Sequence, residues 1–268
     1  MKKSLKTLAL GALILPVGLL SACGDQFNFN SSLNIDAAGK YAASNVADFV
    51  SYVQNEETPV NSEITSCKIV VTGEQDGLTQ EIKGMLLMGE DENYKMAYKL
   101  YTEEENSTTN ATVYYDSTLE GNFMYMDINY SRTATSEKTA LNMNGKYKVQ
   151  VDLENLFDYI PSSIMTPEGF GYITRTFAVS EMLPVLTDEL FGVEKAASES
   201  KVYYKITMVQ ENTESYNYYY LFDNNALQGI YLSYGNVSYS VEPYSGEISF
   251  PNFNGYQELT EQLFGVQA

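Results

Sequence analysis

Apolar residues recur at every second position in two long stretches of this chain, residues 61–150 and 201–250. Within the first stretch, Met124, Met126 and Ile128 alternate with Tyr125, Asp127 and Asn129. Successive side chains of a β-strand point to opposite faces, so a period of two predicts strands with one apolar face. Turn-forming residues separate the segments. The pattern therefore predicts two antiparallel meanders.

A period of three to four residues replaces this alternation near both ends of the chain. Residues 37–54 and 256–264 have this spacing, which predicts a helix with one buried stripe at each place. The stripe of the first helix consists of Tyr41, Val46, Phe49, Val50 and Val53. Residues 24–36 are polar and have no sustained apolar period, as expected of a flexible spacer.

Residues 152–192 interrupt the two meanders with helical periodicity. Asp152 and Ser180 are placed to cap two short helices, and Gly192 follows the second helix where a C′ residue belongs. The apolar positions of these helices are Leu153, Leu156, Phe157 and Ile160, then Leu183, Leu186, Leu190 and Phe191. Residues 161–179 between them are apolar for a connection, and loops of that length are typically functional or mobile.

Together these elements predict an α+β, mainly β fold in a single domain, residues 37–268. We expect one long, curved antiparallel sheet, a half-barrel, with a few helices covering its concave face. Residues 152–192 are then an insertion between the two meanders.

The N-terminal 22 residues are typical of a secretory signal. Lys2, Lys3 and Lys6 form a positive region, and an apolar run over residues 8–20 follows them. The run is too short for a permanent transmembrane helix, which needs about 20 residues. We therefore expect residues 1–22 to be a signal peptide.

The tetrapeptide Leu20-Ser21-Ala22-Cys23 resembles the lipobox of bacterial lipoproteins. The resemblance implies cleavage before Cys23, a diacylglyceryl group on its thiol, and a spacer over residues 23–36. Two acyl chains give stable anchoring where one gives only marginal binding. The prediction is a protein held at the extracytoplasmic face of the bacterial cell membrane. An ordinary cleaved signal peptide that leaves a free cysteine is the alternative.

The chain is strongly acidic, with a formal net charge of −19. Removal of residues 1–22 would take away three lysines and no acidic residue, leaving the remainder more acidic still. Nucleic-acid binding depends on Lys and Arg contacts to phosphates, so this class of function is excluded. An anionic membrane surface would repel the domain, which leaves the predicted anchor as its means of attachment.

Candidate catalytic chemistry is scarce. The chain has no histidine, which removes the commonest general base and metal ligand. No nucleophile elbow, Walker A loop or dinucleotide fingerprint occurs. Acidic runs at residues 90–92 and 103–105 fall in predicted turns, and their spacing does not match an EF-hand loop. We therefore predict no enzyme activity, no catalytic residue, no metal site and no cofactor.

Cys67 is the second of two cysteines. Once Cys23 is acylated, Cys67 has no partner for an intramolecular disulfide. Its strand-like surroundings favour a buried, inert thiol over a reactive one.

Tyrosine and methionine are the remaining compositional features. The 23 tyrosines fill strands, or alternatively present a face to a protein or glycan partner. Methionines on the predicted apolar face pack the core, or alternatively adapt to a ligand. They include Met85, Met88, Met96, Met124, Met126 and Met208.

The order of lipidated cysteine, spacer, helix, meander, apolar insertion and second meander resembles that of the half-barrel lipoproteins of the LolA, LppX and LprG kind. The resemblance covers most of residues 37–265. It implies a monomeric carrier or holder of a lipid or other hydrophobic molecule, with a cavity on the concave face and residues 161–179 as its lid. The residues proposed for cavity and lid are Met96, Met124, Met126, Leu156, Phe157, Ile164, Met165, Phe170, Phe177, Leu186 and Met208. The alternative is a non-carrying surface lipoprotein that binds a protein or polysaccharide through its tyrosine-rich strands.

Overall fold

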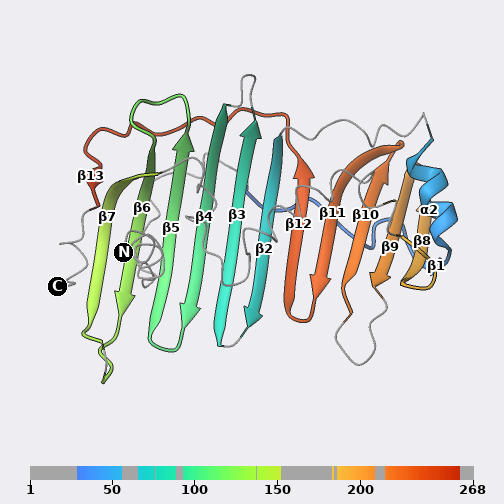
Figure 1. Cartoon of the computed structure of the whole chain (residues 1–268), viewed down its shortest axis with the longest axis horizontal. Helices are drawn as coiled ribbons and strands as arrows, with labels where there is room; N and C mark the ends of the chain where they lie inside the picture. Colours follow the sequence, from blue (N-terminus) through green and yellow to red (C-terminus); the bar gives the residue numbers. More distant parts are fainter. Residues whose placement is uncertain are drawn as a thin grey trace.

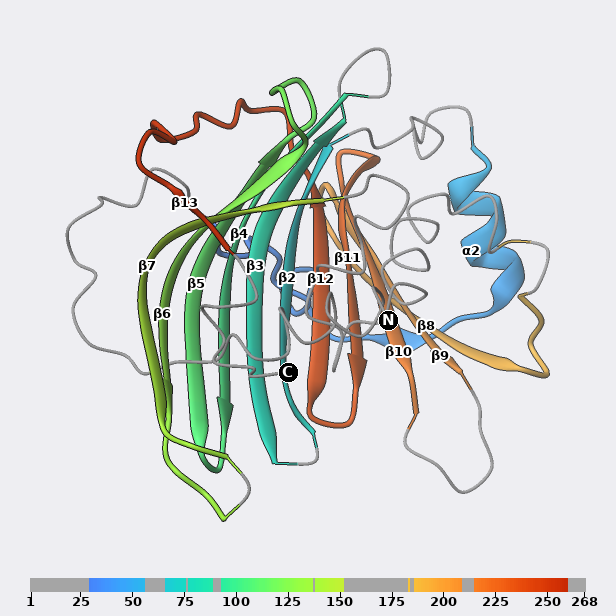
Figure 2. The ribbon, with the colours of Figure 1, turned by 60° about the vertical axis from the view of Figure 1, so that its left-hand side comes forward.

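The described residues form one thirteen-stranded sheet with a single α-helix packed on it (Figure 1). The computed structural model describes residues 29–55, 66–75, 77–88, 93–136, 138–151, 183, 186–208 and 215–259. The sheet is long and curved, as Figure 2 shows. The predicted mainly β half-barrel is therefore confirmed.

Both predicted meanders are present and adjoin in the sheet. The first comprises β2 (Ser66–Gln75), β3 (Leu78–Met88), β4 (Tyr94–Glu104), β5 (Ser107–Asp116), β6 (Phe123–Arg132) and β7 (Leu141–Gln150). The second comprises β8 (Phe191–Ser198), β9 (Lys201–Met208), β10 (Asn217–Asp223), β11 (Ala226–Tyr234) and β12 (Val237–Pro243). The last strand of the second meander, β12, pairs antiparallel with the first strand of the first, β2. One continuous surface therefore extends across both meanders.

The β10–β11 hairpin shows how local sequence sets the strand pairing. Asn224 and Asn225 have φ angles of 49° and 61°, and Asp223 pairs with Ala226 across the turn. Two consecutive left-handed residues match the twist of the flanking strands, and asparagine tolerates that conformation better than most residues. These two residues therefore fix the register in which β10 and β11 pair.

One face of the sheet, which we call the inner face, carries the large apolar core. A row of directly paired residues crosses it from Tyr204 on β9 through Val241 on β12 to Met126 on β6. Except for Gly84, these residues belong to one buried cluster, and most of their neighbours two positions away along each strand belong to it as well. The alternation seen in the sequence therefore places the apolar positions of the two meanders on the same face.

Helix α2 (Val46–Val53) packs on the inner face at the β8–β10 end of the sheet. Asn45 caps it by accepting a 2.8 Å hydrogen bond from the backbone N–H of Asp48. The helix predicted for residues 37–54 is therefore wrong in its first half. Ala42 and Ala43 instead form the edge strand β1 (Ala42–Ala43), which pairs with β8.

Residues 29–41 cross the opposite face, the outer face. Phe29 is buried there beside Met85 and Ala97, and Tyr41 packs edge-on against Tyr219 at a ring distance of 5.9 Å. Ser32 donates its backbone N–H to Glu242 at 2.9 Å. Within the spacer predicted for residues 23–36, residues 29–36 therefore lie along the sheet and are attached to it at Phe29, Ser32 and Leu33. Residues 23–28 lie outside the described residues.

The chain after β12 also crosses the outer face, toward the opposite edge of the sheet. Phe253 stacks on Tyr125 at 3.9 Å, and Tyr256 donates a 2.5 Å hydrogen bond to Asp127. The strand β13 (Gln257–Glu258) then pairs parallel with β7. The helix expected at residues 256–264 is wrong for 257–258, and residues 247–250, the end of the second alternating stretch, do not form a strand. Residues 260–268 lie outside the described residues.

The insertion predicted between the meanders is described only at its margins. Phe191 and Gly192 begin β8, so the helix expected to end there does not extend that far. Leu190, expected among the apolar positions of that helix, lies in a turn and is 54% exposed. Residues 152–182, including the first predicted helix and the connection 161–179, lie outside the described residues. Among described helices, none is long and apolar enough to cross a membrane.

Candidate ligand-binding face

An apolar strip runs along the inner face of β3–β6. On β4, Leu100, Tyr98 and Met96 follow one another at every second position, and each is less than a tenth exposed. Ile128, Met126 and Met124 do the same on β6. Both strands pair with β5, one on each side, so the two runs lie level with each other on the same face. The strip is consequently continuous across four strands.

Four of the proposed cavity residues lie in the inner-face cluster, Met96, Met124, Met126 and Leu186, and the partly buried Met208 packs against it. The fold therefore brings together residues from β4, β6, β9 and the segment before β8. The other six, Leu156, Phe157, Ile164, Met165, Phe170 and Phe177, lie outside the described residues. Their place in a cavity or lid stays a prediction.

Met85 is the exception among the methionines assigned to the apolar face. It lies on the outer face, where it packs with Phe29 and Ala97. The reason is parity: residues 85 and 88 cannot share a face of one regular strand, and Leu86 holds the inner position. Nothing is described for the side chain of Met88.

Helix α2 covers only one end of the inner face. Phe49 contacts Tyr204 and Tyr220, each at a ring distance of 5.1 Å, and Tyr52 contacts Phe222 at 5.0 Å. Eight residues make a helix about 12 Å long, whereas thirteen strands at about 4.8 Å spacing make a sheet nearly 60 Å wide. The α2 helix therefore accounts for the burial of β9 and β10 but not of β3–β6.

A layer of uncharged polar side chains closes one end of the strip. Gln80 on β3, Thr102 on β4 and Thr109 on β5 are cross-strand partners, and all three are buried. The hydroxyls of Thr102 and Thr109 are hydrogen-bonded to each other at 2.6 Å. Tyr130 on β6 extends the same row. Moving along a strand by two residues, to the next side chain on the same face, thus takes the inner face from apolar to polar.

Gln80 is the most unusual member of this layer. Its side chain is 1% exposed, yet within the structure neither its amide oxygen nor its amide nitrogen has a hydrogen-bond partner. An unsatisfied buried polar group costs about 1–3 kcal/mol, and native proteins contain few of them. We therefore expect the Gln80 amide to have a hydrogen-bond partner that is not among the described residues.

A second unpartnered polar atom marks the other end of the strip. The hydroxyl of Tyr115 on β5 is buried without a hydrogen-bond partner, and burial raises the pKa of the phenol. Tyr115 lies six residues along β5 from Thr109, or about 20 Å at 3.3–3.4 Å per residue. A bilayer core of about 30 Å holds two leaflets, so one acyl chain spans about 15 Å. The apolar strip between the two polar positions has room for one such chain.

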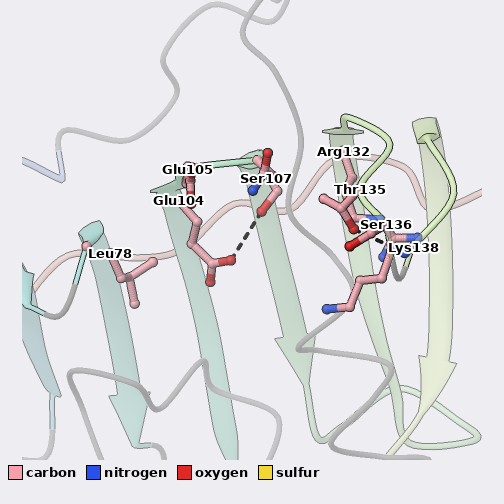
Figure 3. A pocket seen from close by; sticks show the side chains of 10 residues that line it. Leu78, Glu104, Glu105, Ser107, Arg132, Thr135, Ser136 and Lys138 are labelled. Carbon is pink, nitrogen blue, oxygen red and sulfur yellow. Dashed lines mark hydrogen bonds between the residues drawn. The ribbon is translucent and has the colours of Figure 1, made fainter.

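Beyond the polar layer lies an open hollow of about 540 Å³ at the sheet rim. Glu104, Ser107 and Arg132 form the next paired row, Leu78 lies at the start of β3 on the same side of the sheet, and all four line the hollow. Figure 3 shows Glu104 accepting a hydrogen bond from Ser107, with Arg132 and Lys138 across the hollow. The polar layer therefore separates the apolar strip from a charged, open rim.

Tyr130 lies between the polar layer and this rim. Burial raises the pKa of its phenol, Arg132 opposes the change, and Glu104 adds to it. The net shift is upward, so the hydroxyl stays protonated and uncharged. The polar layer is consequently free of formal charge at neutral pH.

The acidic run at residues 103–105 lies at the β4–β5 hairpin, as predicted, and is exposed. Residues 90–92 lie outside the described residues. Within the described residues, no three Cys, Asp or Glu side chains gather in a way that would hold a metal ion.

The tyrosines mostly serve as strand-filling residues in the described part of the chain. Tyr218 and Tyr220 are buried on the inner face, and Tyr219 is half-buried on the outer face against Tyr41 and Tyr231. Tyr216 stacks on Tyr234 at 4.1 Å. No tyrosine whose side chain is described is fully exposed. This arrangement gives little support to a broad tyrosine face for a partner.

Cys67 lies on the inner face at the start of β2 and is 5% exposed. Burial raises the pKa of its thiol to about 12. The predicted burial of this thiol is confirmed, and its inertness stays a prediction.

Comparison with known proteins gives similarity in structure only. No protein family and no curated protein sequence matches the chain. Among solved structures, LprF from Mycobacterium bovis is 9% identical, with a TM-score of 0.42 over 80% of this chain and 100% of LprF. A beta-barrel-like protein with a domain of unknown function from Brucella abortus is 10% identical, with a TM-score of 0.21 over 67% of this chain and 98% of that one.

Proposed function

We propose that this chain is a membrane-anchored extracytoplasmic lipoprotein that binds an acyl-chain-bearing molecule along the inner face of β3–β6. The observation that carries the proposal is the apolar strip bounded by two buried, unpartnered polar positions, Gln80 and Tyr115. Its length of about 20 Å suits one acyl chain. The apolar surface would supply affinity, and the polar ends would supply orientation.

The methionines of the strip support this function. Met96, Met124 and Met126 occupy adjacent positions at the end near Tyr115. Methionine side chains are unbranched and polarisable, so they repack around ligands of different shape. The strip can therefore close on itself without ligand and rearrange around a bound chain.

The anchor would set the geometry of this binding. Cys23 precedes Phe29, the first described residue, by six positions, a contour length of about 20 Å at most. Phe29 is packed on the outer face. A diacylglyceryl group on Cys23 would thus hold the domain close to the bilayer from which it takes its ligand. The protein works as a monomer and performs no catalysis.

The test uses the mature chain, residues 23–268, with Cys23→Ser to remove the acylation site. N-phenyl-1-naphthylamine, whose fluorescence rises in apolar surroundings, is titrated into it. The absence of tryptophan keeps the protein background low. We expect saturable binding of about one probe per chain, the number of strips in the fold.

Two methionine variants distinguish loss of the binding face from general destabilisation of the fold. Met126 is 3% exposed on the inner face, and Met85 is 4% exposed on the outer face. Met126→Gln should weaken probe binding several-fold, whereas Met85→Gln should not. Equal effects of the two substitutions, or no saturable binding by the unmodified chain, would contradict the proposal.

A further inference from the structure

Gln80 points to the kind of ligand that the inner face selects. We infer that Gln80, together with the Thr102–Thr109 hydroxyl pair, binds the uncharged polar group of a neutral lipid, such as the glycerol hydroxyls of a monoacylglycerol. This inference rests on the proposed function, because the acyl chain of the same lipid would occupy the apolar strip. It adds the headgroup class and the end of the strip at which the headgroup lies.

The hydrogen-bonding capacity of the layer fits a hydroxyl or an ester. The Gln80 amide has one acceptor oxygen and two donor hydrogens, and within the structure these atoms have no partner. Thr102 is its direct cross-strand neighbour, so the Cβ atoms are about 5 Å apart. A group that both donates and accepts would satisfy the amide and reach the threonine hydroxyls.

The charge pattern argues against an anionic headgroup. Among the described residues of the row that contains Gln80, none carries a formal charge. The nearest charged residue at the rim is acidic: Glu104 is one strand and one two-residue step from Gln80. The basic residue Arg132 at the rim lies three strands from Gln80, about 14 Å. A carboxylate or phosphate at Gln80 would therefore lose its water without gaining a cation.

The hollow beyond the layer gives the headgroup a path to solvent. It has a volume of about 540 Å³ and opens between the β2–β3, β4–β5 and β6–β7 connections. A headgroup held at Gln80 would lie at its inner end, with the acyl chain directed away from it toward Tyr115. The ligand is therefore expected to enter through the hollow with its chain first.

The experiment compares two lipids that share one acyl chain. Monoolein and oleate are each used to displace N-phenyl-1-naphthylamine from residues 23–268 carrying Cys23→Ser. Each lipid is also tested against Gln80→Leu and against Gln228→Leu, the same substitution at an exposed position on β11. Leucine removes the amide and keeps the side chain's approximate size.

Unmodified protein should bind monoolein about tenfold more tightly than oleate. Gln80→Leu should weaken monoolein binding about tenfold, because a polar group of the bound ligand would then be buried without a hydrogen-bond partner. Its oleate binding should stay within twofold of that of the unmodified protein. Gln228→Leu should change neither. Unaltered oleate binding also shows that the Gln80 variant is folded.

The inference is overturned if Gln80→Leu binds monoolein as well as the unmodified chain, or if oleate is preferred. In both cases the strip still binds an acyl chain, and the proposed function stands. If the unmodified chain binds neither the probe nor either lipid, the proposed function fails and the inference fails with it.

Discussion

The phenol of Tyr204 donates a 3.0 Å hydrogen bond to the carboxylate of Asp48, and this contact attaches the first turn of α2 to the sheet. Lys195 on β8 forms an ion pair with the same carboxylate at 3.0 Å, and Ser44 donates to it at 2.9 Å. Tyr204 is fully buried beneath Phe49. The helix is thus held on the inner face by a polar contact at its start and by aromatic packing along its length.

Removing the Tyr204 hydroxyl should loosen this attachment. We expect Tyr204→Phe to lower the free energy of unfolding by about 1.5 kcal/mol, as for a hydrogen bond to a charged group. Denaturant unfolding followed by circular dichroism measures the change. Tyr101→Phe is the matched control, because Tyr101 donates to Glu103 at 2.6 Å on an exposed surface. Its effect should stay within about 0.5 kcal/mol.

The same site predicts a dependence of stability on pH. Burial raises the pKa of Asp48, but hydrogen bonds from Lys195, Ser44 and Tyr204 outweigh it, so its pKa lies below the usual value. A lowered folded-state pKa means that the carboxylate stabilises the fold above its unfolded pKa of about 3.9. This stabilisation is lost as pH falls through the folded-state pKa.

Unfolding measured at several pH values should therefore show a constant difference between the unmodified chain and Asp48→Asn above about pH 5. The difference should shrink as pH falls below about 4. A difference that grew on acidification would have the wrong sign for this account.

The outer face provides a second stability test at Lys68 and Glu242. Their side chains are 13% and 6% exposed and 3.5 Å apart, and Lys68 also donates to the carbonyl of Asn30 at 2.7 Å. Lys68→Met should cost about 3 kcal/mol, because it leaves a buried carboxylate without its cation. Adding Glu242→Gln should recover part of the loss, since a neutral amide needs no counter-charge. Strictly additive losses in this double-mutant cycle would show that the two groups act independently.

Cys67 should resist thiol reagents in the folded protein. With its pKa raised to about 12 and its side chain buried, the thiol has neither the charge nor the access that disulfide exchange requires. In the Cys23→Ser mature chain at pH 8, an aromatic disulfide reagent should label Cys67 only after denaturant is added. Rapid labelling of the native protein would mean that the start of β2 opens readily.

The predicted anchor is tested at Cys23 in the full-length chain. Cells fed radiolabelled palmitate should incorporate the label into the unmodified protein, which should stay with membranes in high salt because acyl insertion is not electrostatic. Cys23→Ser should abolish labelling. Any Cys23→Ser chain whose signal peptide is still removed by an ordinary signal peptidase should no longer be held at the membrane. Label retained by Cys23→Ser would place acylation elsewhere and contradict the lipobox.

The strands were predictable because one face of the sheet is buried, so every second residue along a strand is apolar. Met124, Met126 and Ile128 all point inward on β6, as their alternation indicates. The start of α2 was not predicted correctly, because Tyr41 lies eight positions before Phe49, a spacing that one face of a helix would also give. It packs instead on the outer face against Tyr219. Periodicity cannot distinguish two faces of a sheet when the chain turns around its edge between them.

Gln80 was not identifiable from the sequence. One polar residue between Leu78 and Ile82 on a strand is common, and its meaning depends on neighbours from β2 and β4 that are distant in the chain. Only the three-dimensional register shows that Gln80 is buried, unpartnered and next to a hollow. The apolar strip could be predicted as a face, whereas its polar boundaries required the fold.

The most direct test of a lipid-binding inner face is to ask what the protein carries from the cell. The secreted Cys23→Ser mature chain, purified without detergent and extracted with organic solvent, is analysed by mass spectrometry beside its Met126→Gln and Met85→Gln variants. We predict about one acyl lipid per chain, with an uncharged headgroup, lost from Met126→Gln and kept by Met85→Gln. A folded chain that yields no lipid, and also takes up none from added vesicles, would contradict the account.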